Sequence, residues 1–319
     1  MAHRTTLLLG AGASRAVSYA GKRSIRSPLD ADFFELLQKV EAKDKDETAV
    51  SELIQWILAA HSPVWTSMER TFYTLHMRAR MQEVLFPAER LDANVKKLLS
   101  CFTRAVDTLL RKAHGTEACK HHMKLLEKMK SSDTVVTFNY DLVAERALKK
   151  LPDMPEFGSW IYGFAAKPVN AENVPALYKL HGSVNWVYED DSEVFKVRQE
   201  NWSDFDNEPG YRSHSGFAIM LPYWDKKIDE QPWSRIWERA AARLKKSSRL
   251  IVWGYSLPLT DLKASELMRL SLGRGCLEDA CVIDPSGDVR TRWRAMFPKQ
   301  RFWPYDDIEE FLENPPTWW

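Results

Sequence analysis

Three residues with hydrogen-bonding or proton-accepting side chains follow strand-like stretches of this sequence. Asn139 and Asp141 come directly after the stretch 134–138, and His181 follows the stretch 176–180. An asparagine amide orients a hydroxyl group or a water molecule without changing its charge, and histidine accepts protons near neutral pH. These residue types can hold a sugar and activate one nucleophile beside it. Taken singly, the asparagine and aspartate are equally typical of a helix cap and turn, and His181 of a buried structural histidine.

A glycine-containing turn follows the first strand-like run, 5–9. The turn consists of Gly10, Ala11, Gly12, Ala13 and Ser14. Glycine has no Cβ, so the chain can turn tightly and a ligand can approach the backbone closely. Ser14 is a candidate cap for a following helix, whose free N–H groups would face a phosphate. The dinucleotide-binding fingerprint has a third glycine where this sequence has Arg15, so an ordinary strand-to-helix turn explains the motif as well.

The elements that must position these residues alternate between strands and helices. Strand-like stretches occur at 5–9, 133–141, 216–224, 249–257, 279–286 and 301–305, and a strand with a hairpin is expected at 176–189. Helical patterns occupy 142–151, 233–248, 264–272 and 306–314. This alternation predicts an α/β fold with a Rossmann-like parallel sheet flanked by helices. In such sheets ligands bind beyond the carboxyl ends of the strands, where the candidate residues lie.

A long helical block interrupts the alternation after the first strand and its glycine turn. The stretches 48–61, 67–84 and 93–114 carry apolar residues at three- and four-residue spacing, which is typical of helices with one buried face. We therefore expect one domain spanning 1–319 with a helical insertion at 32–132. An insertion of this length is expected to cover the mouth of the site or to mediate assembly.

The bulk composition excludes several classes of protein. Lys and Arg number 45 against 44 Asp and Glu, so no overall basic field draws the chain to nucleic acid or to an anionic membrane. No apolar run approaches the roughly 20 residues that span a bilayer, and the N-terminus has no signal-peptide pattern. The four cysteines form no CxxC pair. These features predict a protein of the reducing cytoplasm.

A metal site near Cys119 is suggested by the neighbouring His121 and His122. Adjacent residues on a helix point about 100° apart, so the two imidazoles cannot readily share one ion. We expect no metal there.

The ordered motifs of the chain resemble those of sirtuins. They are GAGAS at 10–14, TFNYD at 137–141, LHG at 180–182, WGYS at 253–256 and VID at 282–284. The closer resemblance is to the sirtuin-like proteins of bacterial antiphage defence, which have stretches similar to KLHGSVNW at 179–186 and LPYWDK at 221–226.

The resemblance implies binding of NAD and cleavage of its nicotinamide–ribose bond. Asn139 and His181 match the catalytic pair, with Asp141 beside the nicotinamide-side ribose. The remaining cofactor-binding residues implied by the resemblance are Gly10, Ala11, Gly12, Ala13 and Ser14 at the pyrophosphate, Gly254, Tyr255 and Ser256 at the second phosphate and ribose, Asp284 at the adenosine ribose, and Asp32 in the loop after the glycines.

The sequence departs from deacetylating sirtuins in one respect. Those enzymes carry a zinc module with two CxxC pairs, and this chain has none, so no structural zinc is expected. Without an acyl-lysine to attack the sugar, water becomes the nucleophile, which predicts an NAD glycohydrolase that releases nicotinamide and ADP-ribose. The alternatives are a zinc-free deacylase or ADP-ribosyltransferase, and a module that senses NAD or ADP-ribose without turnover.

The resemblance also implies how such an activity is restrained. A constitutive NAD hydrolase would kill its host, so we expect gating by homo-oligomerisation or by a partner defence protein, such as a DNA-translocase ATPase or an Argonaute-type protein.

Overall fold

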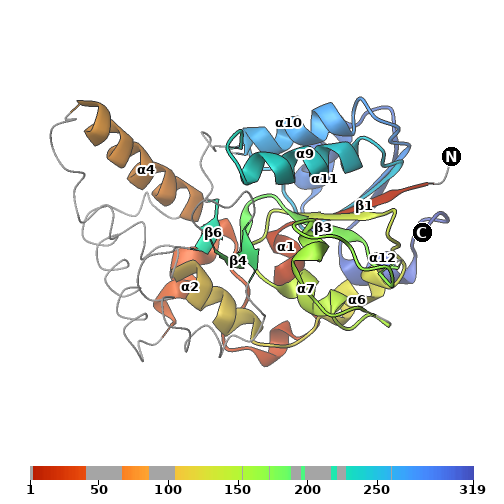
Figure 1. The fold of residues 1–319 in the computed structure, drawn as a ribbon, viewed down its shortest axis with the longest axis horizontal. Helices are drawn as coiled ribbons and strands as arrows, with labels where there is room; N and C mark the ends of the chain where they lie inside the picture. Colours follow the sequence, from red (N-terminus) through yellow and green to blue (C-terminus); the bar gives the residue numbers. More distant parts are fainter. Residues whose placement is uncertain are drawn as a thin grey trace. The chain divides into compact units, whose positions relative to one another are not determined.

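A computed structural model gives the fold of the chain (Figure 1). It describes residues 3–40, 67–85, 105–152, 154–171, 173–187, 195–197, 217–220, 228–259 and 261–319. The described residues group into two compact units. The first comprises Met1–Tyr19, Thr116–Met220 and Trp224–Trp319, and the second comprises Ala20–Gly115 and Leu221–Tyr223.

The first unit is built on a six-stranded sheet. Its strands are β1 (Thr5–Leu9), β2 (Thr134–Thr137), β3 (Ala176–Lys179), β7 (Arg249–Trp253), β8 (Asp279–Ile283) and β9 (Arg301–Tyr305). They lie in the order β3-β2-β1-β7-β8-β9, and every neighbouring pair is parallel. Counted along the chain, this is the doubly wound 3-2-1-4-5-6 order of a Rossmann fold, in which the direction of winding reverses between β1 and β7. The predicted parallel α/β sheet is confirmed.

The register of the sheet brings the ends of all six strands into one row. The last residues of the strands are paired across the sheet in the sequence Lys179, Thr137, Leu9, Trp253, Ile283 and Tyr305. Whatever follows these residues therefore emerges at a single edge. Asn139 and His181 each lie two positions beyond the row, after the neighbouring strands β2 and β3.

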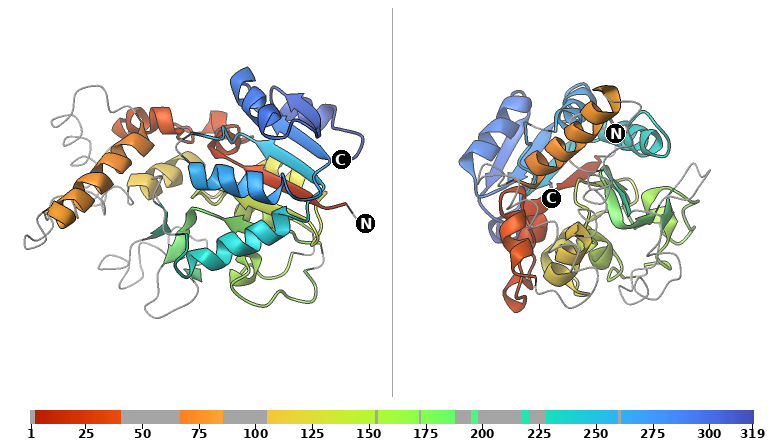
Figure 2. Two further views of the ribbon diagram at one scale, coloured as in Figure 1. Left: turned by 90° about the horizontal axis from the view of Figure 1, so that it is seen from above. Right: turned by 90° about the vertical axis from the view of Figure 1, so that its left-hand side faces the viewer.

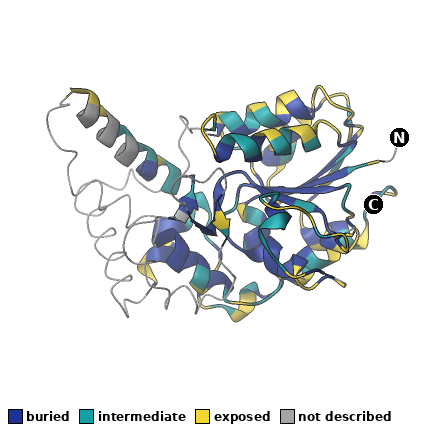
Figure 3. Cartoon of the chain, in the orientation of Figure 1, coloured by how far each residue is buried: buried dark blue, intermediate teal, exposed yellow. Residues whose placement is uncertain are grey.

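Helices cover the sheet on both faces. They are α1 (Ala11–Arg15), α6 (Lys120–Leu126), α7 (Val143–Leu148), the 3₁₀ turn η3 (Ser159–Tyr162), α9 (Trp233–Leu244), α10 (Leu262–Ser271), α11 (Gly287–Met296) and α12 (Ile308–Glu313). In Figure 1, α9 and α10 lie together on one face and α1, α6 and α7 on the other. Every residue of β1, β2 and β8 is buried, which explains why their sequences are apolar or β-branched apart from Asp279 (Figure 3).

A small antiparallel sheet follows β3. It consists of β5 (Lys196–Val197), β4 (Gly182–Val187) and β6 (Phe217–Ile219), in that order. The chain leaves the parallel sheet at Gly182, whose φ of +84° favours glycine, and a Cβ there would lie 1.9 Å from the carbonyl oxygen of Ala218. The strand and hairpin expected at 176–189 correspond to β3 and to the antiparallel pairing of β4.

The second unit is helical in its described parts (Figure 2). It contains the 3₁₀ turns η1 (Ala20–Lys22) and η2 (Asp30–Asp32), the helices α2 (Phe33–Gln38) and α4 (Met68–Leu85), and helical residues 105–114. The helix expected at 67–84 is confirmed as α4, whereas the one expected at 48–61 lies outside the described residues. α6 belongs to the first unit, so the helical insertion predicted at 32–132 extends across the boundary between the units. Among the described helices, none is long and apolar enough to cross a bilayer.

Candidate functional site

Four residues at the ends of β1 and β2 form one hydrogen-bonded group, which we call the Asn139 cluster: Gly10, Ser14, Asn139 and Asp141. The Nδ2 atom of Asn139 donates to the carbonyl oxygen of Gly10 at 2.8 Å and to the Oγ atom of Ser14 at 3.0 Å. The Ser14 hydroxyl in turn donates to Asp141 at 2.6 Å. The structure thus joins the glycine turn to the predicted catalytic asparagine.

The orientation of the Asn139 amide follows from its neighbours. A backbone carbonyl such as that of Gly10 can only accept a hydrogen bond, so the atom facing it must be the NH₂ group. Both N–H bonds of that group are then used, and the carbonyl oxygen Oδ1 is directed elsewhere. Asn139 is half-buried. This oxygen is therefore the acceptor that the side chain can offer to a hydroxyl group or a water molecule.

Ser14 and Asp141 also have local structural roles. Asp141 accepts a hydrogen bond from the N–H of Val143 at 3.0 Å, at the start of α7. The turn interpretation is therefore correct for this residue, alongside its contact with the serine, whereas the N-cap of α7 is Leu142. Ser14 does not cap a following helix, because it lies inside the five-residue α1, whose N-cap is Gly10.

The glycines of the turn form a joint with the end of β7. The N–H groups of Gly10 and Gly12 donate to the carbonyl oxygens of Trp253 at 3.0 Å and Gly254 at 2.9 Å. A Cβ on Gly12 would lie 2.7 Å from the Cα of Gly254, and one on Gly254 would lie 2.2 Å from the amide nitrogen of Ala13. In this structure the missing Cβ atoms therefore allow backbone to pack on backbone across the point where the winding of the sheet reverses.

His181 lies in a second group, the His181 cluster: Phe138, Tyr140, His181, Tyr255 and Asp261. The Nε2 atom of His181 is 3.1 Å from a carboxylate oxygen of Asp261, and both side chains are almost fully buried. The Phe138 ring packs on the imidazole with centroids 4.9 Å apart and stacks on Tyr255 at 4.5 Å. Because Phe138 and Tyr140 flank Asn139 in sequence, the two clusters are adjacent along one stretch of chain.

Asp261 is the site residue that the sequence reasoning missed. It is the N-cap residue of α10, and its Oδ1 atom accepts from the N–H of Ala264 at 3.3 Å. The sequence signal for it was an aspartate three residues before the helical pattern 264–272, which indicates a cap and says nothing about a histidine 80 positions earlier.

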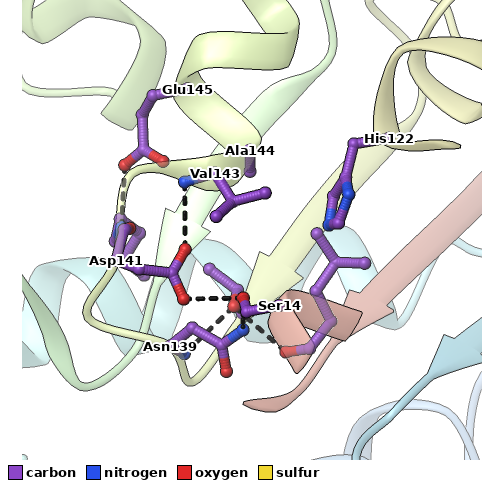
Figure 4. Close-up of a pocket in the computed structure, with 10 residues that line it drawn as sticks. Ser14, His122, Asn139, Asp141, Val143, Ala144 and Glu145 are labelled. Atoms are coloured by element: carbon purple, nitrogen blue, oxygen red, sulfur yellow. Dashed lines mark hydrogen bonds and ion pairs between the residues drawn. The ribbon is translucent and has the colours of Figure 1, made fainter. Parts of the chain in front are cut away.

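A small pocket is lined in part by the side chains of the Asn139 cluster (Figure 4). It is lined by Leu9, Ser14, His122, Thr137, Asn139, Asp141, Val143, Ala144, Glu145 and Lys179. The buried ion pair Lys179–Glu145, at 2.8 Å, bounds the pocket, and the lysine ammonium also donates to the backbone carbonyl of Asp141. Burial raises the pKa of the Glu145 carboxyl above its ordinary value, more than Lys179 lowers it. The pair stabilises the loop that carries Asn139.

The other predicted cofactor-binding residues belong to neither cluster. Ser256 is exposed, and its carbonyl oxygen accepts from Arg292 at 2.9 Å. Asp284 follows β8 and accepts from the N–H of Ser286 at 2.9 Å, and burial raises the pKa of its carboxyl. Ala11 is exposed and Ala13 is fully buried.

Asp32 belongs to the second unit. There it accepts from the N–H of Leu29 at 2.8 Å and lies 3.3 Å from the guanidinium of Arg26.

The two histidines near Cys119 have separate surroundings. His121 lies 3.4 Å from Glu309, whereas the His122 ring packs on Trp253 with centroids 4.4 Å apart. No group of three or more potential metal ligands occurs among the described residues. The absence of a structural zinc stays a prediction, to be checked by elemental analysis of the purified chain.

Comparison with known proteins gives one family match. Residues 133–267 match the family model of the SIR2-like domain. No curated protein matches the chain. Solved structures that resemble it include Sir2 with a p53 peptide and NAD⁺, at 14% identity over 97% of this chain and 90% of that chain, with a TM-score of 0.45. A Sir2 homologue in complex with ADP-ribose matches at 14% identity over 97% and 89%, with a TM-score of 0.45.

The matched region contains β2, β3 and β7 with Asn139, Asp141, His181, Gly254 and Asp261. The matched region thus holds the whole His181 cluster and two of the four residues of the Asn139 cluster. Residues 133–267 of this chain are thus similar to the SIR2-like domain.

Proposed function

We propose that this protein is an NAD glycohydrolase, which cleaves the nicotinamide–ribose bond of NAD with water. The arrangement that carries the proposal is the adjacency of the Asn139 cluster and the buried His181–Asp261 pair at one edge of a doubly wound sheet. A module that only binds NAD needs neither an oriented acceptor oxygen nor a histidine paired with a carboxylate. The SIR2-like domain match supports NAD as the substrate.

The reaction requires that NAD and a water molecule are held in place and that one group accepts a proton. Nicotinamide is already cationic in NAD, so the C1′–N bond breaks with its electron pair passing to the ring, and the ribose becomes an oxocarbenium-like centre. The oxygen of a water molecule then forms a bond to C1′ and loses a proton. Fixing the reactants together and excluding bulk water lowers the barrier for this step.

Each cluster has a role in this reaction. The Oδ1 atom of Asn139 accepts a hydrogen bond from a ribose hydroxyl or from the attacking water, because its NH₂ group is held by Gly10 and Ser14. His181 receives the proton as the general base, a contribution typically worth about 10²–10⁴-fold in rate. The predicted contacts of Gly254, Ser256 and Asp284 with the second phosphate and the adenosine ribose belong to the same proposal.

The test follows nicotinamide release from NAD by the pure chain, with and without the products of neighbouring genes. We expect Asn139→Ala and His181→Ala each to lower release by at least about 10²-fold, and the double variant to be little worse than the poorer single variant. Near-wild-type release by both folded single variants would contradict the assignment.

The alternatives separate in the same assay. Release that requires an added acylated or acceptor protein would identify a deacylase or an ADP-ribosyltransferase. Binding of NAD without release, even with the partner present, would identify a sensor. We further propose, from the resemblance to antiphage proteins, that hydrolysis depletes NAD during infection and is gated by self-association or by a partner protein.

A further inference from the structure

We propose that Asp261 is a positioning residue that fixes the proton of His181 on Nε2, which leaves Nδ1 as the proton acceptor. The consequence for catalysis rests on the proposed function, whereas the placement of the proton does not. The inference begins from the contact between the Nε2 atom and a carboxylate oxygen of Asp261, 3.1 Å apart.

The carboxylate itself is held in place. Its Oδ1 atom accepts from the N–H of Ala264 at 3.3 Å, as the cap of α10, and its Oδ2 atom accepts from the Tyr255 hydroxyl at 3.4 Å. Oδ2 is also the atom that faces His181. An ionised carboxylate only accepts hydrogen bonds, so the ring atom facing it must carry a hydrogen. In the neutral imidazole the lone pair is then on Nδ1.

Aromatic packing fixes the plane of the imidazole. The Phe138 ring packs against the imidazole, and the Tyr255 ring stacks on Phe138 in turn, with an interplanar angle of 21°. Tyr255 thus contributes twice, through its ring to the stack and through its hydroxyl to Asp261. A histidine held by a carboxylate and a ring has little freedom to rotate. This fixed orientation suits a base that must accept a proton at one position.

The cap of α10 makes one substitution unusually informative. In Asp261→Asn, the N–H of Ala264 requires an oxygen at the Oδ1 position, so the amide NH₂ group must occupy the position that faces His181. The NH₂ group donates, which forces Nε2 to accept and moves the ring proton to Nδ1. Asparagine caps helices as well as aspartate does, so the helix is retained. The substitution therefore reverses the tautomer while preserving the shape of the site, the effect described for the equivalent change in serine proteases.

Asp261→Ser is the comparison variant. Serine also caps helices, and it is too short to reach His181 in the manner of aspartate. It removes the carboxylate without imposing the opposite tautomer. A merely structural role predicts that serine is worse than asparagine, because asparagine has nearly the same shape as aspartate. The proposal predicts the reverse order.

The kinetic experiment uses the activated wild-type chain and both variants. We expect Asp261→Asn to lower the kcat of nicotinamide release by at least about 10²-fold with KM and Tm close to wild type, and Asp261→Ser to lower it less. In the His181→Ala background, Asp261→Asn should have no further effect. Asp307→Asn is the matched control, since Asp307 caps α12 through the N–H of Glu310 at 2.8 Å, and its kcat should equal that of wild type.

The structural experiment does not depend on activity. The ¹⁵N shifts of labelled histidine, with His181 assigned by its loss in His181→Ala, should report the Nε2–H form in wild type and the Nδ1–H form in Asp261→Asn. An Nδ1–H form in wild type, or a kcat for Asp261→Asn equal to or above wild type, would overturn the proposal. If His181→Ala abolishes release and Asp261→Asn leaves it intact, the proposed function stands and this inference fails. If wild type shows no release with its partner, the proposed function fails, and the ¹⁵N result alone decides the inference.

Discussion

At the scale of single residues, the Asn139 amide illustrates how neighbours determine the use of a side chain. Its NH₂ group is held by a backbone carbonyl and by a serine hydroxyl, so its oxygen is left for a ligand. The side chain at position 139 must therefore offer a hydrogen-bond donor on one side and an acceptor on the other. Neither leucine nor aspartate satisfies both.

This requirement predicts the outcome of Asn139→Asp. The new carboxylate oxygen would face the carbonyl oxygen of Gly10, which now lies 2.8 Å from a donor, and the two oxygens would repel each other. We expect nicotinamide release to fall as far as in Asn139→Ala, by at least about 10²-fold, even though the change is nearly isosteric. Circular dichroism and Tm of the variant would show that it folds. Release above one tenth of wild type would contradict the orientation of the amide.

The thiols differ strongly in their surroundings. Cys281 is fully buried in β8, and burial raises the pKa of its thiol well above the ordinary value, whereas Cys276 is exposed. We expect a maleimide at pH 8 to label Cys276 within minutes and Cys281 only after unfolding, as read from peptide masses.

The same pKa shift gives a pH dependence of stability. The unfolded thiol of Cys281 ionises near pH 8.5, while the folded thiol keeps its proton. The folded pKa is raised, so the contribution to stability is present below about pH 8.5 and declines as the pH rises above it. The alkaline loss of Tm should be smaller in Cys281→Ala. An equal loss in both proteins would assign the effect to other groups.

At the scale of elements, the joint between the glycine turn and the end of β7 depends on backbone contacts. Gly254 has a φ of +64°, and a Cβ there would lie 2.2 Å from the amide nitrogen of Ala13. We expect Gly254→Ala to lower the free energy of unfolding by at least about 2 kcal/mol, since the left-handed conformation alone costs about 1–2 kcal/mol. Gly21→Ala is the control, because a Cβ at Gly21 meets nothing within 4 Å. Equal urea midpoints for the two variants would contradict the joint.

The contact between the glycine turn and the end of β7 also changes how a substitution of Gly12 must be interpreted. Gly12→Val is the direct way to test whether a pyrophosphate approaches the glycine turn, because the added side chain would fill the space beside the backbone. In the structure, the added Cβ would lie 2.7 Å from the Cα of Gly254. Loss of NAD binding in that variant would therefore report a displaced turn as readily as a blocked ligand.

The sequence predicted the parallel sheet well and the pairing of distant polar groups poorly. β1, β2, β7 and β8 were recognisable because strands buried on both faces have apolar or β-branched runs, which in β7 and β8 follow the charged first residues Arg249 and Asp279. Asn139 and His181 were recognisable because they follow such strands. The contact of His181 with Asp261 joins residues far apart in sequence, and no local pattern encodes such a contact.

The buried pair Lys179–Glu145 shows the same difficulty. Glu145 lies within a short helix and Lys179 within a strand, where charged residues usually indicate an exposed face. Both side chains are instead about 1% exposed. The cost of burying these charges is offset by their contact with each other and by the Tyr162 hydroxyl, which donates to Glu145. These partners lie far apart in sequence, so no local pattern reveals them.

At the scale of the whole molecule, the predicted helical block 32–132 is larger than a crossover between parallel strands needs. We predict that it covers the mouth of the NAD site or mediates self-association. Hydrogen exchange should then slow within this block when ADP-ribose binds, or sedimentation should show an oligomer that is lost when its apolar residues are made polar. A monomer at all concentrations with no protection of the block would contradict the prediction.

The single row formed by the six strand ends has a consequence for how related sequences can differ in length. Removal of one residue from a strand would draw the following loop back by about 3.3 Å and would turn every later side chain of that strand to the opposite face. Insertions beyond the row, in contrast, leave Leu9, Thr137 and Trp253 in register. Alignment gaps among relatives with the same chemistry should therefore fall after Asn139, His181 and Gly254, and the distance from the start of each strand to these residues should be constant.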